Sequence, residues 1–562
     1  MKLNAFLKQI KQENSSLETV QLSLKKNGNV KKLLTALSDK TNTGCENISE
    51  LDLSGSDLRN EDIVTLVKAL NNLPNIKTLR LDNCAITDDH TTPHLVALGH
   101  VTSLSLKSNR LKNRPAFNTD KLNALYLDDN PELNVMGALL GFSAYATEPK
   151  LKILSLNRCN VNDQDLEFLM GDRSKLKILK ELHLHGNELS SSGVLCLKGM
   201  DLLEILDLGK NRKVDNYAIG KLQWPVLHTL NIEGCDVSDY ALDKLQCPVL
   251  HTLNIEGCDV SPYVFESLAA MKRLRTVNLS YNPKLKFYQE EEEDSKKPNK
   301  LEQIQKVKLN FCQLTDDHVP LLMALFPNLT HLEIANNQLT HVGVGNLLTR
   351  EHLKVLDVST NSMFSILSAK SQKAPRANKT IAAEKAKVEE LLLAVVKAKK
   401  LIRINLSGTG LPDDMLASFI PAEGSARKLR SINGIPCVEL KDVLKQREEA
   451  KNNALAAQAV ATSSASVDGV IDIEAKPSKS AQIKTLKARV KDLEAQLAEA
   501  NATITQLQGA KSSDVPHEKG RVLKQVAQYE TKATSPHGLF AKSKKEGPVT
   551  SASIVAESSF SS

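Results

Sequence analysis

The chain has 562 residues, a net charge of +7 at pH 7, 41% hydrophobic residues and 4% aromatic residues. Because basic and acidic residues are interspersed and aromatics are few, nothing favours nucleic-acid binding. Lysines interrupt residues 1–11 before an apolar run can form, so no secretory signal peptide is expected. The longest strongly apolar run, residues 391–396, is too short to cross a bilayer, so no membrane span is expected.

One sequence phrase dominates the chain: an apolar residue, two variable residues, and then L-x-L-x-x-N/C. It occupies residues 76–84 and 179–187 and recurs about fifteen times, mostly at spacings of 21 to 30 residues. The alternating leucines predict a short strand with one buried and one solvated face. Because one unit cannot bury its apolar face alone, the units are predicted to stack into a solenoid with a shared core.

The second half of each unit predicts a helix. In residues 314–325, Thr-Asp-Asp precedes apolar residues at helical spacing, and residues 87–89 and 412–414 occupy the same place in other units. A strand followed by a helix, repeated, predicts a right-handed α/β solenoid with parallel strands on its concave face. The units of 23–24 residues leave less room for a helix.

These motifs resemble the leucine-rich-repeat family over roughly residues 15–440, and the longer units look like its ribonuclease-inhibitor type. The resemblance implies an α/β horseshoe that binds a protein partner through its concave face. We expect the solenoid and its cap in residues 1–440, with about fifteen repeats and insertions at 288–300 and 365–380. A helix and linker (441–480), a coiled coil (481–508) and a disordered tail (509–562) are expected to follow.

Residues 483–507 contain a heptad pattern whose apolar spacings alternate between three and four for four heptads, which indicates an α-helical coiled coil. The seam residues are Ile483, Leu486, Val490, Leu493, Leu497, Ile504 and Leu507. Ile and Val at a with Leu at d favour a parallel homodimer. A single amphipathic helix folded back on the solenoid remains the alternative.

Five of the nine cysteines occupy the N/C position of the repeat: Cys84, Cys159, Cys235, Cys258 and Cys312. The resemblance implies that this side chain turns inward and satisfies backbone groups of the loop. No C-x-x-C pair occurs, so we expect reduced thiols in a cytosolic, reducing compartment and no metal site. Phosphate-loop, zinc-protease and nucleophile-elbow motifs are absent from the sequence, so neither a cofactor, a catalytic residue nor an enzyme is expected.

The strand positions that face solvent are the candidate partner-binding residues. They are Tyr126, Glu181, His183, His185, Asp207, Asn231, Glu233, Asn254 and Glu256, and the same pattern places Arg80, Asp128 and Arg403 toward solvent. Glu181, Asp207, Glu233 and Glu256 predict a mildly acidic strip beside the two histidines, which suits a basic patch on a protein partner. A merely solvated face is the alternative.

The polar residues 544–562, with scattered glutamates and an apolar residue third from the end, resemble the carboxyl-terminal translocation signals of Dot/Icm-type bacterial effectors. Leucine-rich repeats joined to a coiled coil are also a recurring layout among those effectors. The resemblance implies a secreted virulence effector that binds a protein in a host cell. The alternative function is regulation of a host enzyme such as a small GTPase, with Arg80 or Arg403 as an arginine finger.

Overall fold

The computed structural model describes residues 2–12, 17–25, 27–58, 60–70, 73–87, 98, 100–112, 121–140, 150–170, 175–285, 299–364, 377–422 and 428–464. The chain divides into two compact units, Met1–Ala454 and Leu455–Ser562, and the fold below is that of the first. The predicted coiled coil with its seam residues, the predicted tail, residues 288–298 and residues 365–376 lie outside the described residues.

The described strands form one sheet of 17 strands, in which each strand from β1 to β16 pairs in parallel with the next along the chain. β17 closes the sheet as an antiparallel hairpin with β16. The α/β fold with a parallel repeat sheet is therefore confirmed. The strands are β1 (Thr19–Gln21), β2 (Glu50–Asp52), β3 (Thr78–Arg80), β4 (Ser103–Ser105), β5 (Ala124–Tyr126), β6 (Ile153–Ser155), β7 (Glu181–His183), β8 (Ile205–Asp207), β9 (Thr229–Asn231), β10 (Thr252–Asn254), β11 (Thr276–Asn278), β12 (Lys306–Lys308), β13 (His331–Glu333), β14 (Val355–Asp357), β15 (Arg403–Asn405), β16 (Ser431–Ile432) and β17 (Ile435–Pro436).

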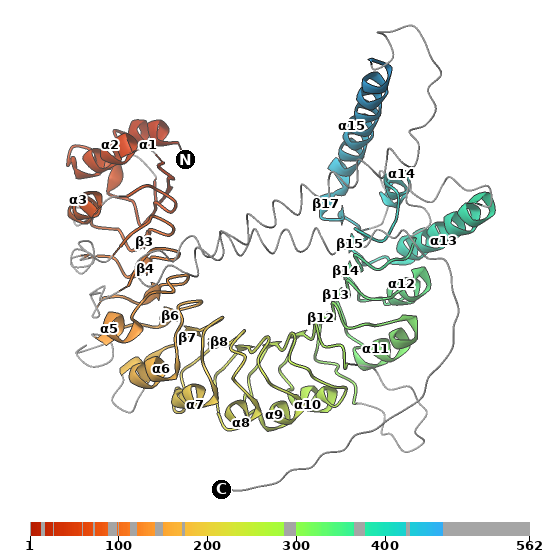
Figure 1. Ribbon diagram of the computed structural model, residues 1–562, viewed down its shortest axis with the longest axis horizontal. Helices are drawn as coiled ribbons and strands as arrows, with labels where there is room; N and C mark the ends of the chain where they lie inside the picture. The colour runs from red at the N-terminus through yellow and green to blue at the C-terminus, as the bar shows by residue number, and fades with distance from the viewer. Residues whose placement is uncertain are drawn as a thin grey trace, which may run out of the picture. The chain divides into compact units, whose positions relative to one another are not determined.

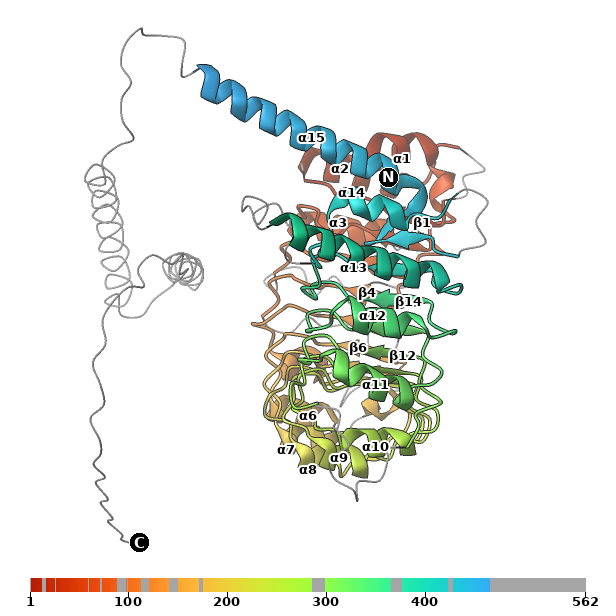
Figure 2. The same cartoon turned by 90° about the vertical axis from the view of Figure 1, so that its right-hand side faces the viewer.

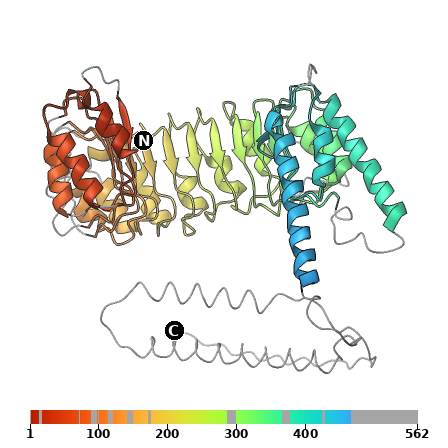
Figure 3. The same cartoon turned by 90° about the horizontal axis from the view of Figure 1, so that it is seen from above.

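Helices follow the strands and cover the outer side of the arc, while the strands lie side by side on its inner side (Figures 1 and 3). The α-helices are α1 (Leu3–Gln9), α2 (Asn27–Ser38), α3 (Asn60–Leu70), α5 (Val135–Leu140), α6 (Asp163–Met170), α7 (Ser191–Val194), α8 (Asn216–Ile219), α9 (Asp239–Lys244), α10 (Val264–Ala270), α11 (Val319–Leu325), α12 (His341–Leu348), α13 (Ala377–Lys397), α14 (Asp413–Leu416) and α15 (Cys437–Ser464). The 3-10 helices are η1 (Thr43–Cys45), η3 (Lys175–Ile178), η4 (Leu195–Leu197), η5 (Asp316–His318) and η6 (Ala417–Phe419). In the short units, α7, α8 and α9 have only 4, 4 and 6 residues, as the unit length leads one to expect.

The core is one continuous layer between the sheet and the helices. The central residue of a strand is buried, as at Leu182 and Leu253, and apolar helix residues cover it from the other side. Near the carboxyl end, β14 pairs directly with β15, and the 21-residue helix α13 packs against α12 (Figure 2). Leu440 and Leu444 of α15 are buried in the same core, so the expected boundary at residue 440 falls inside this helix.

A ladder of inward-facing side chains closes the turn after each strand. Its asparagines are Asn109, Asn130, Asn187, Asn211, Asn282, Asn337 and Asn361, and all of them are buried. Asn130, for example, donates from Nδ2 to the carbonyls of Leu106 (3.0 Å) and Leu127 (2.7 Å), and its Oδ1 accepts from the Leu111 amide (3.3 Å). The residue before each ladder position has a positive φ, such as 61° at Lys210, which turns the next side chain inward.

The five repeat-position cysteines join the same ladder. Each Sγ donates to a carbonyl of the preceding repeat, for example Cys159 to Leu127 at 3.1 Å and Cys258 to Ile232 at 3.0 Å. Burial raises the pKa of these thiols to about 11 for Cys84 and Cys312 and to about 12 for the others. These cysteines are structural residues that replace asparagine, as the resemblance to leucine-rich repeats implies.

Thiol reactivity provides a direct check of this ladder. The thiolate is the reactive species, so a buried thiol with a raised pKa reacts slowly. At pH 8 we expect a disulfide reagent such as Ellman's reagent to modify Cys196 and Cys437, which are partly exposed. The seven buried cysteines should react only after the protein unfolds. In guanidinium chloride all nine should react. Rapid reaction of more than two thiols in the native protein would contradict the inward orientation.

Candidate functional site

The concave face is built from the residues on either side of each buried strand centre. In β7 to β11 these flanking residues are partly exposed. The register of the parallel strands aligns His183, Asp207, Asn231, Asn254 and Asn278 as neighbours across the sheet. Residues separated by up to 95 positions in the sequence therefore form one surface.

The central part of this surface is an acid–amide ladder, in which an asparagine of one strand donates to a carboxylate of the preceding repeat. Its residues are Asp207, Asn231, Glu233, Asn254, Glu256 and Asn278. The three steps measure 2.8 Å from Asn231 to Asp207, 3.1 Å from Asn254 to Glu233, and 2.8 Å from Asn278 to Glu256. Because Asp207 and each of the three asparagines also accept a backbone N–H from the residue two positions on, these side chains are fixed in position.

Basic side chains of the chain itself lie beside the predicted acidic strip. Lys210 Nζ lies 2.9 Å from Glu233 Oε1. His185 Nδ1 lies 3.6 Å from Asp207 Oδ1, and His183 Nε2 lies 3.5 Å from Glu181 Oε2. The structure thus places the four predicted carboxylates on one face beside both histidines, but three of them contact a basic side chain of the chain itself.

Gly209 explains how His185 reaches this surface. A Cβ at this glycine would lie 2.7 Å from His185 Nδ1 and 3.0 Å from Asn231 Nδ2. The missing side chain leaves room for the imidazole of His185 beside Asp207 of the acid–amide ladder. Glycine is used here for space, since its φ is not positive.

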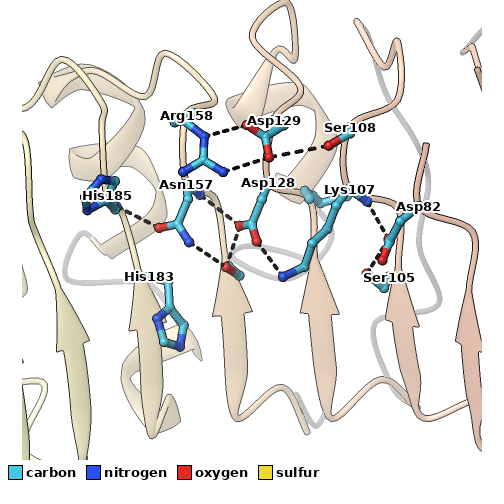
Figure 4. Close-up of polar contacts among 12 residues, drawn as sticks. Asp82, Ser105, Lys107, Ser108, Asp128, Asp129, Asn157, Arg158, His183 and His185 are labelled. Atoms are coloured by element: carbon cyan, nitrogen blue, oxygen red, sulfur yellow. Dashed lines mark hydrogen bonds and ion pairs between the residues drawn. The ribbon is translucent and has the colours of Figure 1, made fainter. Parts of the chain in front are cut away.

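Asp128 corrects the sequence analysis, because its side chain is buried although the pattern placed it toward solvent. Its carboxylate pairs with Lys107 Nζ at 2.7 Å and accepts from Ser155 Oγ at 2.5 Å and the Asn157 amide at 3.0 Å (Figure 4). Asn157 Oδ1 in turn accepts from the His185 amide at 2.7 Å. The polar network therefore runs from the repeat of β4 to that of β7, where it reaches the backbone amide of His185.

Sequence reasoning did not single out Lys107 or Asn157. The signal was present, because Lys107, Asp128, Asn157 and His185 hold the same place in four consecutive repeats. An alignment of the repeats at this position puts Lys107 beside Asp128 of the next repeat. Lys107 Nζ also lies 4.9 Å from the Tyr126 ring centroid. Burial, followed by the Glu181 carboxylate, raises the pKa of the Tyr126 phenol.

The concave face as a whole is acidic, although the chain carries +7. Counting the outward strand residues and the second residue after each strand from β1 to β15, there are ten carboxylates against five lysines and arginines, or about five net negative charges. The carboxylates are Glu50, Asp52, Asp82, Asp128, Glu181, Asp207, Glu233, Glu256, Glu333 and Asp357, and the bases are Arg80, Lys107, Lys306, Lys308 and Arg403.

Within the described ranges, no group of three or more His, Cys, Asp or Glu side chains is arranged to hold a metal ion. In the same ranges no helix is long and apolar enough to cross a membrane. Both arginines considered for GTPase regulation are exposed, and Arg80 pairs with Glu50 at 3.1 Å.

These features define an α/β repeat protein whose long parallel sheet and inward asparagine and cysteine ladder fit a leucine-rich-repeat solenoid. No family model matches the chain, and a search of curated proteins finds no match. Among 291 matching chains of solved structures is one from the crystal structure of the Rad7 and Elc1 complex in yeast. It is 15% identical, with coverage of 68% of this chain and 85% of that chain, and its TM-score is 0.38. This likeness is too low to carry an argument.

Proposed function

We propose that this protein is a non-enzymatic scaffold that binds a basic surface of a protein partner through its concave face. The observation that carries the proposal is the acid–amide ladder, which holds carboxylates of three successive repeats on a solvent-facing sheet. Side chains that are already fixed lose little conformational entropy on binding, which favours affinity. An open face of fifteen strands, roughly 65–70 Å along the arc at about 4.8 Å per strand, suits a protein better than a small substrate.

Neutralisation of the carboxylates tests this proposal without breaking the ladder. In the variant Glu181→Gln/Asp207→Asn/Glu233→Gln/Glu256→Gln, the side chains at the three ladder positions 207, 233 and 256 each keep an oxygen that accepts the asparagine N–H. We expect a partner captured from eukaryotic cytosolic lysate by the wild type to bind about tenfold more weakly, corresponding to about 1.4 kcal/mol. Affinity for the wild type should fall as salt is raised.

The matched control neutralises carboxylates outside the concave face, in Asp243→Asn/Glu266→Gln, both exposed residues of α9 and α10. This control variant should retain the partner. Equal binding by the concave variant and the wild type would disprove the proposed site. A partner captured by the full chain but not by residues 1–464 would assign binding to the region beyond the solenoid.

The proposed setting is a bacterial effector in a host cytosol, with residues 481–508 forming a homodimer that raises avidity. This part of the proposal is based on the sequence patterns of residues 481–508 and 544–562. A reporter fusion with and without residues 544–562 measures translocation. Unchanged delivery after the deletion would remove the basis for the effector role.

Regulation of a GTPase is the second candidate, and the exposed Arg403 is the observation that favours it. Arg80 is a weaker choice, because its ion pair with Glu50 would have to break before it reached a nucleotide. Stimulated GTP hydrolysis that is lost in Arg403→Ala would support this alternative. The absence of any stimulation would exclude it.

A further inference from the structure

Three tyrosines lie at the start of α8, α9 and α10. These helices lie on the outer side of the solenoid (Figure 1). Tyr217, Tyr240 and Tyr263 are 23 residues apart and are 60%, 61% and 62% exposed. We call them the tyrosine row. The concave face does not include them, and no packing requirement of the core explains large aromatic side chains at three consecutive exposed positions. Tyrosine is enriched at protein interfaces, where it often supplies much of the binding energy.

Hydrogen bonds between repeats fix the spacing of the row. The residue before Tyr217, Asn216, donates from Nδ2 to Ser238 Oγ at 3.0 Å, and its Oδ1 accepts from the Ser238 amide at 2.7 Å. Asp239, the residue before Tyr240, accepts from the Ser261 amide at 3.1 Å and from its hydroxyl at 2.6 Å. Since α8 also packs against α9 and α9 against α10, the row is preorganised.

Lysines cover part of the row and supply its charge. Lys221 Nζ lies 5.5 Å from the Tyr217 ring centroid, and Lys244 Nζ lies 3.8 Å from that of Tyr240. Neither ammonium group forms an ion pair within the described part of the chain, and Lys244 Nζ also donates to the Tyr240 hydroxyl. The exposed carboxylates of Asp243 and Glu266 follow Tyr240 and Tyr263 by one helical turn. Two exposed cations above aromatic rings therefore favour a ligand that combines apolar rings with carboxylates.

We propose that the tyrosine row binds a proline-rich segment of a partner protein in the polyproline II conformation, with acidic residues beside the prolines. Packed helices lie about 8–10 Å apart. A polyproline II helix rises about 3.1 Å per residue and has three residues per turn, so every third residue recurs at about 9.3 Å. One proline thus meets each tyrosine, whereas an extended β-strand repeats on one face at about 6.8 Å and an α-helix at about 5.4 Å.

The surrounding groups match the needs of this ligand. Polyproline II has no internal hydrogen bonds, so its carbonyls are free to accept from tyrosine hydroxyls. Carboxylates one position along from the row-facing prolines lie near the ammonium groups of Lys221 and Lys244. Because the segment is already extended before it binds, the entropy lost on association is small.

The test uses the full chain and a fluorescein-labelled peptide of four Pro-Glu-Pro units, measured by fluorescence anisotropy. We expect saturable binding that is about tenfold weaker in Tyr217→Ala/Tyr240→Ala/Tyr263→Ala. A Gly-Glu-Gly peptide of equal length has the same charge without the polyproline II conformation, and it should also bind about tenfold more weakly. Val342→Ala, which changes an exposed side chain in the first turn of α12, is the matched control and should bind like the wild type.

Reversing the charge of the two lysines distinguishes direct contact with the peptide from a merely structural role of these side chains. In Lys221→Glu/Lys244→Glu the preference should reverse toward a peptide of four Pro-Lys-Pro units, whereas a variant that only loosened the helices would lose both peptides. Circular dichroism melting checks that each variant is folded. Absence of binding to the wild type at millimolar peptide, or equal binding by the triple tyrosine variant, would overturn the proposal. The concave neutralised variant should bind this peptide normally, so the two surfaces are tested independently.

Discussion

Replacement of Asn211 by alanine is expected to lower the free energy of unfolding by about 3 kcal/mol or more. The side chain is fully buried, and its Nδ2 donates to the carbonyls of Leu184 at 2.9 Å and Leu208 at 2.8 Å. Its Oδ1 accepts from the Leu189 amide at 3.2 Å. Alanine leaves these backbone groups buried without partners, each at a cost of about 1–3 kcal/mol, and also leaves a cavity.

The chain itself provides the graded control for this substitution. Cysteine occupies the same place in the next repeat, where Cys235 Sγ donates to the Leu208 carbonyl at 3.3 Å. Asn211→Cys keeps one of the bonds and fills part of the space, so its stability should lie between those of the wild type and Asn211→Ala. Denaturant unfolding followed through the single, buried Trp224 measures both variants. Equal stability of the wild type and Asn211→Ala would rule out an energetic role for the ladder.

The resemblance to leucine-rich repeats implies this ladder, because the same position recurs in every repeat. An asparagine or cysteine at a fixed distance from the alternating leucines has the same backbone turn around it in every repeat. The flanking residue in the left-handed region was not predicted from residue type. Positions such as Tyr281 and Phe311 adopt φ of 58°, although bulky residues rarely do so. The repeated fold imposes this conformation and overrides the local preference.

Contacts between repeats were harder to predict than positions within one. Asp207, Glu233 and Glu256 lie on the concave face, but the pattern within one repeat does not show that the asparagines of the following repeat bind them. The pattern places Asp128 toward solvent because it describes only positions within one repeat. Its burial depends on Lys107 of the preceding repeat and Ser155 of the following one. The strand phrase gives no signal for the tyrosine row, because the row lies in the helix half of each unit.

Two glycines of α12 are expected to respond to alanine with opposite signs. Gly→Ala in a helix normally stabilises by up to about 1 kcal/mol. At Gly345 nothing lies within 4 Å of the added Cβ, so this gain should be seen. At Gly343 the Cβ would overlap the Asp316 carboxylate, with Cγ at 2.8 Å. That carboxylate accepts from the amide (2.9 Å) and hydroxyl of Thr340, the residue that caps α12.

Gly343→Ala therefore has to displace Asp316 and break the link between η5 and the start of α12. We expect a loss of about 2 kcal/mol, the sum of a weakened cap and a partly exposed charged hydrogen bond less the gain in helix propensity. Hydrogen exchange should show faster exchange in α12, while the repeats around β8 remain protected, because each repeat contacts only its neighbours. If both glycine variants were stabilised, Asp316 would be free to move and the link between these repeats would contribute little to stability.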